Sequence, residues 1–425
     1  MGKILLKNIL LDNQTVDIYI SGKHIERILP AGSPAPENFL PDSETEAEDC
    51  RGKAAVPGFV NMHTHAAMSM MRGIGEDIVF ADWIRHIWEV ESKIDSEYVY
   101  WATRVACIEM MRTGTTTFND HYWYPLTGRK AALEAGLRPV SSYVFCDKFD
   151  PAEAEREKEQ MQRMYEETLG QSGDCSFAVG FHAIYSVSEE MIVWAHEFAR
   201  RHGARLHFHL SETEPELTEA QAVHGMSPVQ YLDRLGVLDE YSVAAHTLWL
   251  SEEDIEILGK RKVNCVHNIN SNLKLASGYR FRYSELRDAG ANVCMGTDGC
   301  ASSNNLDMLE AMKTAALVQK AWRRDPSAMP LGELLDTATV NGAKALGLNT
   351  GAIKEGALAD IMIVNTDNSF FLSPGSFLAN FIYSAHSDCI ESLICGGRFV
   401  MKGREVEDER EILDTARGIL SKLKN

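Results

Sequence analysis

Residues 176–210, SFAVGFHAIYSVSEEMIVWAHEFARRHGARLHFHL, contain two short apolar runs separated by a longer charged segment. The runs at 176–184 and 204–210 have the length of buried β-strands, whereas 188–203 has the apolar spacing of an amphipathic helix. A buried strand, a helix and a second buried strand, in this order, are typical of a parallel sheet covered by helices. This part of the chain therefore indicates an α/β protein.

The same alternation extends in both directions along the chain. Eight apolar runs occur in all, at 54–65, 115–120, 138–145, 176–184, 204–210, 242–246, 263–268 and 292–299. Charged segments of helical spacing, such as 152–169 and 306–324, separate several of them. Because eight strand–helix units close a barrel, we predict a (β/α)8 TIM-like barrel over residues 57–349. An open, doubly wound sheet is the structural alternative.

The two ends of the chain have a different pattern. Short β-type runs broken by Asn, Gly and Pro fill the first 56 residues, and similar runs return after residue 350. Between them, 33–52 is a polar, proline-containing excursion. We therefore predict a small, discontinuous β-sandwich domain built from both chain ends, residues 1–56 and 350–425.

Composition excludes several classes of protein. The 425 residues are 45% hydrophobic and 24% charged, which is ordinary for a globular chain with a sizeable core. The formal net charge of −19 argues against nucleic acid or an anionic membrane as the partner. The nine cysteines form no C-x-x-C pair and indicate free thiols. No apolar run reaches the roughly 20 residues of a membrane helix, and no signal-peptide pattern opens the sequence, so we expect a cytoplasmic protein.

The first apolar run ends in a histidine pair, His63 and His65, within FVNMHTH. Residues i and i+2 of a strand point to the same face, so the two imidazoles converge. Such a pair can chelate zinc or a similar divalent ion. Two hydrogen-bonded histidines at a strand end are the structural alternative.

A second group of polar side chains lies at the ends of later runs. His207 and His209 end the run at 204–210, Glu212 follows, His246 ends the next run, and Asp298 lies in the last one. The carboxyl ends of barrel strands share one mouth, where active sites form. We therefore expect these side chains to meet the first histidine pair.

Taken together, these motifs resemble the amidohydrolase superfamily. They are H-T-H at 63–65, HLSET at 209–213, AAH at 244–246, HNINSNLKLASG at 267–278 and GTDG at 296–299. The likeness is greatest to the 5-methylthioadenosine/S-adenosylhomocysteine deaminase branch, a relative of chlorohydrolases and guanine deaminases. It covers nearly the whole chain, including a tail motif, GAIKEGALADIMIVN, at 351–365.

The resemblance implies a single divalent metal ion, Zn²⁺ in the first place and Fe²⁺ in the second. Its ligands would be His63, His65, His209 and Asp298. His207 is then a structural neighbour deeper in the barrel. Binuclear members of the superfamily bridge two metals with a lysine at the end of strand 4. The corresponding run here, 176–184, has no lysine, which favours one metal.

The resemblance also assigns catalytic roles to Glu212, His246 and Asp298. A zinc-bound water has a pKa of about 7, so a hydroxide is available to attack the amino-bearing ring carbon. Asp298 would accept the proton of that water, and Glu212 would carry a proton to the ring nitrogen. His246 would steady the tetrahedral adduct by hydrogen bonding, and the amine would leave as ammonia.

Substrate contacts are implied at Glu91 and His182, in addition to Glu212. By resemblance, Glu91 and His182 face the sugar and the base edge of a nucleoside. The structural alternatives are an ordinary acid on a charged helix and a buried histidine. Tyr143 stands where the resembling deaminases have an arginine, and the loop HIWEVE at 86–91 is one residue shorter than theirs. Both departures argue against a carboxylate-bearing substrate such as S-adenosylhomocysteine.

Two further motifs are given structural interpretations. Ser271 and Lys274 match an S-x-x-K pattern, but no other motif of the penicillin-binding enzymes accompanies them, so we expect a packed loop beside the metal. The methionines and tryptophans at positions 68, 70, 71, 83 and 88 fit either helical core spacing or a wall of the pocket.

The sequence thus predicts a metal-dependent hydrolytic deaminase of a purine nucleoside, of the adenosine, 5′-methylthioadenosine or S-adenosylhomocysteine type. Deamination of a free base or pterin and triazine dechlorination are alternatives on the same site. An alternative of another class is a non-catalytic binding protein on this scaffold. The expected partner is a small amino-heterocycle, and the resemblance implies a homodimer or higher homo-oligomer.

Overall fold

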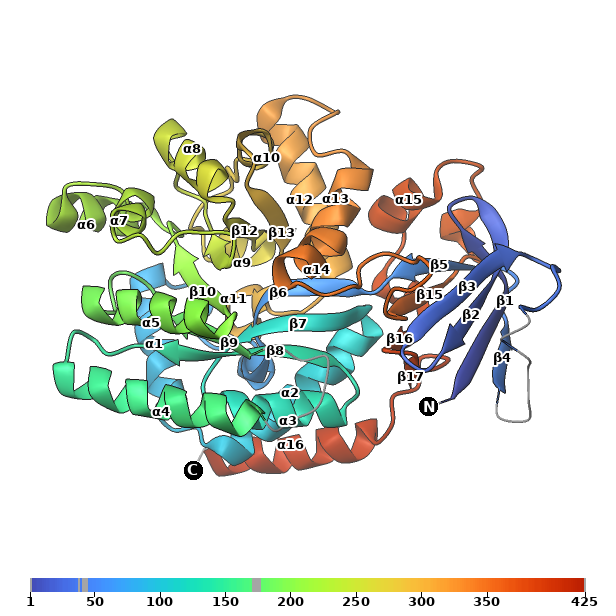
Figure 1. Cartoon of the computed structure of the whole chain (residues 1–425), viewed down its shortest axis with the longest axis horizontal. Helices are drawn as coiled ribbons and strands as arrows, with labels where there is room; N and C mark the ends of the chain where they lie inside the picture. The colour runs from blue at the N-terminus through green and yellow to red at the C-terminus, as the bar shows by residue number, and fades with distance from the viewer. Residues whose placement is uncertain (1, 37–38, 40–44, 170–176, 424–425) are drawn as a thin grey trace.

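The computed structural model describes residues 2–36, 39, 45–169 and 177–423 (Figure 1). Its larger sheet contains nine parallel strands, which are β6 (Phe59–His65), β7 (Thr115–His121), β8 (Arg138–Phe145), β9 (Phe177–Phe181), β10 (Arg205–Leu210), β11 (Ser242–His246), β12 (Asn264–His267), β13 (Asn292–Met295) and β14 (Asp298–Gly299). All eight apolar runs of the sequence supply strands to this sheet.

The sheet curls so that its two ends approach each other. The strand order is β13-β12-β11-β10-β9-β8-β7-β6-β14, so β13 and β14 stand at opposite ends of it. Only Gly296 and Thr297 separate these two strands along the chain. Asp298 and Gly299 pair with Thr64 and His65 of β6. The fold is therefore a mixed α/β architecture with a curled parallel sheet, consistent with the predicted TIM-like barrel and not with an open, doubly wound sheet.

Helices connect the strands and cover the outside of the sheet (Figure 1). They are η1 (Ala66–Met71), α1 (Phe80–Glu91), α2 (Ser96–Arg112), α3 (Pro125–Glu134), α4 (Pro151–Leu169), α5 (Glu189–His202), α6 (Glu214–His224), α7 (Pro228–Arg234), α8 (Glu252–Arg261), α9 (Ile269–Lys274), α10 (Tyr283–Ala289), α11 (Cys300–Ser303), α12 (Met308–Arg323), α13 (Leu331–Ala338) and α14 (Val340–Leu346).

Helix α5 shows why the predicted segments become helices. The Ser188 hydroxyl accepts a hydrogen bond from the Met191 amide and so caps the first turn. Acidic residues occupy the first turn and basic residues the last, as the helix dipole favours. Gly203 ends the helix at φ +64°, a conformation that glycine adopts without strain.

A second sheet draws its strands from both ends of the chain. Its order is β17-β16-β15-β5-β1-β2-β3, with β4 paired to β1. The strands are β1 (Lys3–Leu11), β2 (Gln14–Ser21), β3 (His24–Pro30), β4 (Thr45–Asp49), β5 (Lys53–Pro57), β15 (Ile361–Asn365), β16 (Ile390–Cys395) and β17 (Arg398–Met401). The segment 33–52, predicted as an irregular excursion, therefore contains one strand; its residues 37–38 and 40–44 lie outside the described part.

The chain beyond residue 350 also holds helical segments that the sequence analysis did not identify. They are η2 (Ser369–Phe371), α15 (Phe377–Ala379), η3 (Asn380–Ser384), η4 (Ser387–Cys389) and α16 (Glu409–Leu423). Helix α16 leaves the second sheet and runs alongside α2 (Figure 1). Arg112 of α2 pairs with Glu409 at 2.5 Å, and Ile419 joins the apolar cluster around α1 and α2.

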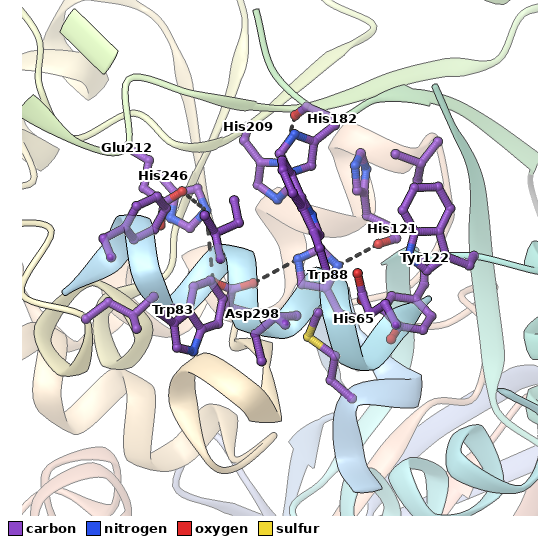
Figure 2. A pocket seen from close by; sticks show the side chains of 18 of the residues that line it. His65, Trp83, Trp88, His121, Tyr122, His182, His209, Glu212, His246 and Asp298 are labelled. Atoms are coloured by element: carbon purple, nitrogen blue, oxygen red, sulfur yellow. Dashed lines mark hydrogen bonds and ion pairs between the residues drawn. The ribbon is translucent and has the colours of Figure 1, made fainter. Parts of the chain in front are cut away.

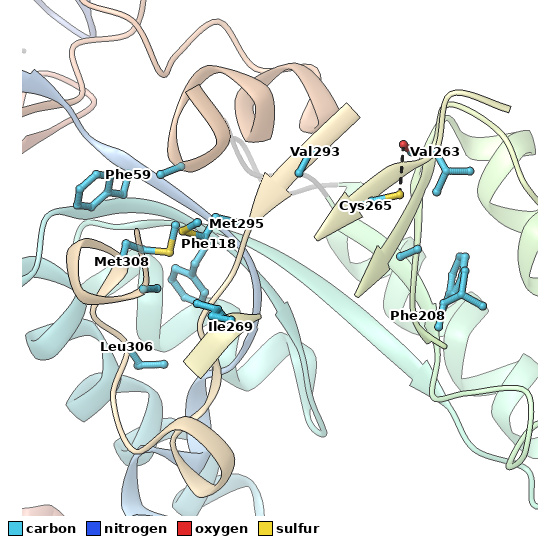
Figure 3. Close-up of a cluster of buried hydrophobic side chains, with 14 of the residues drawn as sticks. Phe59, Phe118, Phe208, Val263, Cys265, Ile269, Val293, Met295, Leu306 and Met308 are labelled. Atoms are coloured by element: carbon cyan, nitrogen blue, oxygen red, sulfur yellow. Dashed lines mark hydrogen bonds between the residues drawn. The ribbon is translucent and has the colours of Figure 1, made fainter. Parts of the chain in front are cut away.

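A continuous apolar core lies between the curled sheet and its helices (Figure 3). Phe59, Phe118 and Phe208 are fully buried strand residues, and Met308 reaches the same core from α12. The two sheets are joined by a buried ion pair between Arg138 of β8 and Asp360, which precedes β15. Among the described helices, none is long and apolar enough to span a lipid bilayer.

Candidate active site

The predicted site residues converge at the carboxyl ends of the parallel strands. His63 and His65 end β6, His209 lies near the end of β10, His246 ends β11, and Asp298 begins β14. Figure 2 shows His65, His209, His246 and Asp298 directed toward one pocket. Residues separated by more than 200 positions thus share one mouth because the strands are parallel.

The geometry of four of these side chains suits a metal ion. Nε2 of His63 and Nε2 of His65 lie 3.2 Å and 3.1 Å from Oδ1 of Asp298. Ligand atoms of these three residues all lie within 4.8 Å of one another, and so do those of His63, His209 and His246. Two histidines and a carboxylate, with a third histidine adjacent, form a donor set that zinc prefers.

Hydrogen bonds at the far ring nitrogens orient two of the three proposed histidine ligands. Nδ1 of His65 donates to the His121 carbonyl at 2.5 Å, and Nδ1 of His209 donates to the His182 carbonyl at 2.8 Å. Each ring therefore presents an unprotonated Nε2 to the pocket, the form in which histidine binds metals. Nε2 of His63 is buried without a hydrogen-bond partner, as expected of a ligand atom.

His207 lies behind His63, as expected for a structural neighbour. Its Nε2 is 2.9 Å from Nδ1 of His63, and its own Nδ1 is 3.3 Å from the Ser142 hydroxyl. If His63 binds a metal through Nε2, its Nδ1 must donate to His207. The chain of hydrogen bonds then continues from His207 to Ser142.

His246 has the opposite tautomer. The Asn272 amide donates to its Nδ1 at 3.0 Å, so a neutral imidazole must carry its proton on Nε2. That Nε2 lies 3.6 Å from Glu212 Oε2 and 4.0 Å from Asp298 Oδ2. Burial lowers the pKa of His246 to about 3, which keeps the ring neutral at pH 7. This geometry favours His246 as a hydrogen-bond donor to the pocket over a role as a metal ligand.

Two buried acids in the pocket hold opposite protonation states. Burial and the nearby charge of Asp298 raise the pKa of Glu212 well above its usual range. Burial alone would also raise the pKa of Asp298, but the adjacent imidazoles of His63 and His65 hold that pKa well below its usual range. The surroundings thus favour the protonated form of Glu212 and the ionised form of Asp298, the combination needed for a proton donor beside a proton acceptor.

Glu216 holds the loop that carries Glu212. Its carboxylate accepts hydrogen bonds from the backbone amides of Ser211 at 2.9 Å and Glu212 at 2.8 Å. Ser211, His246 and Asp298 all have left-handed backbones, with φ values of 51°, 75° and 64°. Such non-glycine conformations cost on the order of 1–3 kcal/mol each and persist where the surroundings enforce them.

The loop HNINSNLKLASG packs beside the proposed metal site. Ser271 donates to Oδ2 of Asp298 at 2.6 Å, while its neighbour Asn272 orients His246. Lys274 pairs with Glu76 at 2.9 Å and does not contact the Ser271 hydroxyl. This arrangement agrees with the structural interpretation of the S-x-x-K pattern.

Helix α1 and the segment before it form an apolar wall of the pocket. Its lining side chains from this region are Met68, Phe80, Trp83, Ile84, Ile87 and Trp88. Met70 and Met71 pack in the apolar cluster behind this wall, and so does Trp83. Some methionines and tryptophans of this region therefore line the pocket and others pack in the core, so both interpretations left open by the sequence apply.

The two predicted substrate contacts also line the pocket. Burial raises the pKa of Glu91, against hydrogen bonds from Trp123 and Tyr122. The Ser186 hydroxyl donates to the Ala183 carbonyl and lies 2.8 Å from Nδ1 of His182. His182 must donate to this hydroxyl, which leaves its Nε2 as an acceptor.

Sequence reasoning missed several pocket residues, above all His121, which ends β7, and Tyr122 and Trp123, which follow it. Both ring nitrogens of His121 are buried without a hydrogen-bond partner. The run TTTFNDHYWY at 115–124 held the signal, because its polar and aromatic end lies at the same mouth as the histidine pair. Tyr185, just beyond β9, was missed in the same way.

Comparison with known proteins identifies the family. The model of the amidohydrolase family matches residues 54–400, and the chain belongs to this family. The match covers all strands of the curled sheet and, in the second sheet, β15, β16 and most of β5 and β17.

Individual relatives are named as deaminases. A 5′-deoxyadenosine deaminase from Methanoregula boonei is 41% identical over 422 residues, which is 99% of this chain and 95% of the relative. A 5-methylthioadenosine/S-adenosylhomocysteine deaminase from Archaeoglobus fulgidus is 40% identical over 87% of this chain and 88% of its own. The crystal structure of an adenosine deaminase from Xanthomonas campestris with bound zinc superposes with a TM-score of 0.91 at 29% identity, covering 99% and 98% of the two chains.

Proposed function

We propose that this protein is a metal-dependent hydrolytic deaminase of purine nucleosides that replaces the amino group of an adenine ring and releases ammonia. The observation that carries the proposal is the convergence of Glu212, His246 and a donor set for a metal in one buried pocket. Its relatives named as 5′-deoxyadenosine and 5-methylthioadenosine/S-adenosylhomocysteine deaminases support the nucleoside class.

The residues that would hold the metal are His63, His65, His209 and Asp298. Zinc is the preferred ion because the similar adenosine deaminase structure carries zinc, and Fe²⁺ is the second choice. When bound, zinc lowers the pKa of a coordinated water to about 7 and so supplies a nucleophile near neutral pH. The orphaned Nε2 of His63 and the orientations of His65 and His209 support this ligand set.

The chain's own acids and bases would move the protons. Asp298 holds at Oδ2 the proton that the attacking water gives up. Glu212 delivers its proton to the ring nitrogen next to the amino-bearing carbon, which makes that carbon more electrophilic. His246 donates its Nε2 hydrogen to the oxygen that adds to the ring. The proton held by Asp298 passes to the amino group, which leaves as ammonia, and the hydroxyl proton of the adduct returns to Glu212 as the ring carbonyl forms.

Substrate binding would divide between polar and apolar groups. His182 offers its Nε2 as an acceptor for a hydrogen-bond donor of the base, and Glu91 accepts from the ribose hydroxyls. The apolar wall, including Trp83 and Trp88, covers the base and excludes bulk water. Exclusion of water strengthens the hydrogen bonds made inside the pocket.

The test is ammonia release by zinc-reconstituted protein across one panel of compounds. The panel holds 5′-deoxyadenosine, 5′-methylthioadenosine, adenosine, guanine, a pterin and an aminotriazine. We expect release from the adenosine-type compounds, with a kcat/KM at least tenfold above that for any free base. Release only from guanine, the pterin or the triazine would overturn the nucleoside assignment, and a metal-loaded protein inactive on every compound would indicate a binding protein.

We further propose two folding units: a closed (β/α)8 barrel over 57–349 and a β-sandwich from 1–56 and 350–425. The curled sheet and the second sheet, which combines β1–β5 with β15–β17, support this division. A homodimer or higher homo-oligomer is proposed by family resemblance, and a cytoplasmic location from the scattered cysteines of the sequence. Size-exclusion chromatography with light scattering tests the oligomeric state.

A further inference from the structure

A second hollow adjoins the pocket and is called here the outer chamber. Trp88, Glu91 and Trp123 line both spaces, whereas none of the proposed metal ligands lines the outer chamber. Its remaining lining consists of Ser92, Cys146, Asp147, Lys148, Asp150, Glu153 and Glu157. The outer chamber therefore continues the pocket past Glu91, on the side that does not contain the metal site.

The position of Glu91 relates the outer chamber to one part of the substrate. Under the proposed function, the base lies beside Glu212 and the ribose beside Glu91. The ribose 5′ carbon is attached next to the carbon that bears the 3′ hydroxyl, so its substituent can extend past Glu91. The outer chamber is the space that adjoins the pocket there, so it is positioned to receive this substituent.

The outer chamber is acidic. Its lining holds four carboxyl groups, those of Asp147, Asp150, Glu153 and Glu157, in addition to Glu91, and a single cationic side chain, Lys148. The Lys148 ammonium lies 5.4 Å from the centre of the Trp88 ring, in a cation–π contact. The lining of the outer chamber therefore contains more acidic than basic side chains.

No arginine of the neighbouring strand compensates for this charge. Tyr143 of β8 occupies the position where the sequence resemblance leads to an arginine, and its hydroxyl donates to Gln160 of α4 at 2.7 Å. Arg156 is directed to Glu153, with which it pairs, and does not line the outer chamber. A ligand carboxylate would therefore meet carboxylates without a guanidinium to bind it.

Two of the acids hold the chamber in shape. Asp147 accepts hydrogen bonds from the amides of Phe149 and Ser188, at 3.2 Å and 2.9 Å. Glu157 accepts from the Cys146 amide at 3.1 Å. Asp150 immediately precedes α4, and Glu153 lies in its first turn, where it is a partly exposed partner in an ion pair with the more exposed Arg156. Glu153 is therefore the position at which the chamber's charge can be changed without removing a buried hydrogen bond.

We propose that the outer chamber selects nucleosides by the charge of the 5′ substituent. It admits neutral groups such as 5′-deoxy and 5′-methylthio and favours an ammonium group, but it disfavours a carboxylate. This inference rests on the proposed function and narrows its substrate class to adenosines without an anionic 5′ group.

The test compares S-adenosylhomocysteine with its decarboxylated counterpart, 5′-(3-aminopropylthio)-5′-deoxyadenosine, which differs only by lacking the carboxylate. Dissociation constants are measured by calorimetry on the zinc-loaded Glu212→Gln variant, and kcat/KM on the unaltered protein. We expect the decarboxylated compound to bind at least about tenfold more tightly at low salt, with a ratio that falls as ionic strength rises. Equal or tighter binding of S-adenosylhomocysteine, or no binding of either compound, would overturn the inference.

A pair of charge-reversal variants tests the chamber itself. Glu153→Lys places a cation in the lining and should narrow the preference for the decarboxylated compound severalfold. Glu155→Lys is the matched control, because Glu155 lies on the same helix, pairs with Lys158 at 2.8 Å and does not line the chamber. An equal shift in both variants would show a general charge effect and contradict the inference.

The two proposals fail in different ways. Ammonia release from 5′-deoxyadenosine tests the deaminase function alone, because this compound has no charge on its 5′ group. Binding to the Glu212→Gln variant tests the charge preference without any turnover. If the protein releases ammonia but shows no charge preference, only the inference about the outer chamber is refuted. If it shows the charge preference but releases no ammonia, only the deaminase assignment is refuted.

Discussion

Asn272 donates a hydrogen bond to Nδ1 of His246 at 3.0 Å, and this contact sets which ring nitrogen of His246 carries the proton. With Nδ1 as the acceptor, the Nε2 hydrogen faces Glu212 and Asp298. A side chain outside the pocket lining thus makes His246 a hydrogen-bond donor rather than a metal ligand. Asn272 is a positioning residue in this scheme.

Asn272→Asp should lower kcat more than KM. An aspartate accepts instead of donating, so the His246 proton moves to Nδ1 and the pocket loses its donor. Loss of one such donor costs about 10²–10³ in rate. Steady-state kinetics measure the effect, and the pH profile should change because the new carboxylate stabilises the charged imidazole. Asn270→Asp is the matched control, because Asn270 donates its hydrogen bond to the exposed Glu310 and not to His246. Equal losses of kcat in both variants would argue against an effect on the His246 tautomer.

Glu212→Gln should abolish turnover and retain the metal. The amide matches the shape of the carboxyl but cannot deliver a proton, and general acid catalysis contributes about 10²–10⁴ in rate. Ammonia release measures activity, and atomic absorption measures zinc per chain. Near-normal activity would exclude Glu212 as the proton donor, whereas loss of zinc would make it a ligand.

Metal removal should inactivate the protein and lower its melting temperature. A metal that binds only the folded state stabilises that state by mass action. Chelation followed by scanning calorimetry measures the shift in melting temperature, and added zinc should restore both activity and melting temperature.

His209→Ala should reduce bound zinc to a small fraction. His224→Ala is the control and should leave the zinc content unchanged, because His224 stacks on Tyr231 away from the site. Full zinc content in His209→Ala would contradict the ligand assignment.

Glu157 should make stability fall as pH rises. Burial raises its pKa from 4.5 to about 7 in the folded protein, so the folded state binds more protons than the unfolded state between these values. The stability present below pH 4.5 is then lost as pH rises through 7. Glu157→Gln should be more stable than the unaltered protein at pH 8 by about 1–3 kcal/mol and equal to it near pH 4. Urea denaturation at several pH values measures the free energy of unfolding of both proteins. Glu155→Gln, at an exposed position, is the control. The same pH dependence in Glu157→Gln and the unaltered protein would contradict the prediction.

Asp360→Ala should destabilise the contact between the two sheets. Asp360 accepts hydrogen bonds from Thr350 and the Gly396 amide and pairs with Arg138, which is almost fully buried. Removing one partner of a buried ion pair costs about 3–5 kcal/mol because the other charge remains buried. Glu355→Ala, which breaks the exposed Arg27–Glu355 pair, should cost about 0–1 kcal/mol. Similar losses in the two variants would refute the special role of the buried pair.

Much of the fold could be predicted from local pattern. The eight apolar runs became the strands of the curled sheet because their length and burial are encoded within each run. Strand β4 and helix α16 were not predicted, for different reasons. The side chains of β4 are largely exposed, so it shows no apolar alternation, and it forms by pairing with β1. Helix α16 follows a region of strand character and gains its partner only in α2.

In the candidate site, too, some residues could be predicted from local pattern and others could not. Strand periodicity was enough to place His63 and His65 on one face, and the parallel topology was enough to bring His209, His246 and Asp298 to the same mouth. His121 was missed because a single histidine at a strand end carries no spacing signal of its own. Its place in the pocket follows from the neighbouring strands.

The sequence alone determined which residue types stand at the strand ends, because side-chain direction follows from local periodicity. Only the tertiary structure decided their chemical state. The donor at Nδ1 of His246, the protonated Glu212 and the acidic outer chamber depend on groups far away in the chain. Hydrogen-bond partners and the degree of burial set tautomers and pKa values, and both arise only when distant segments pack together.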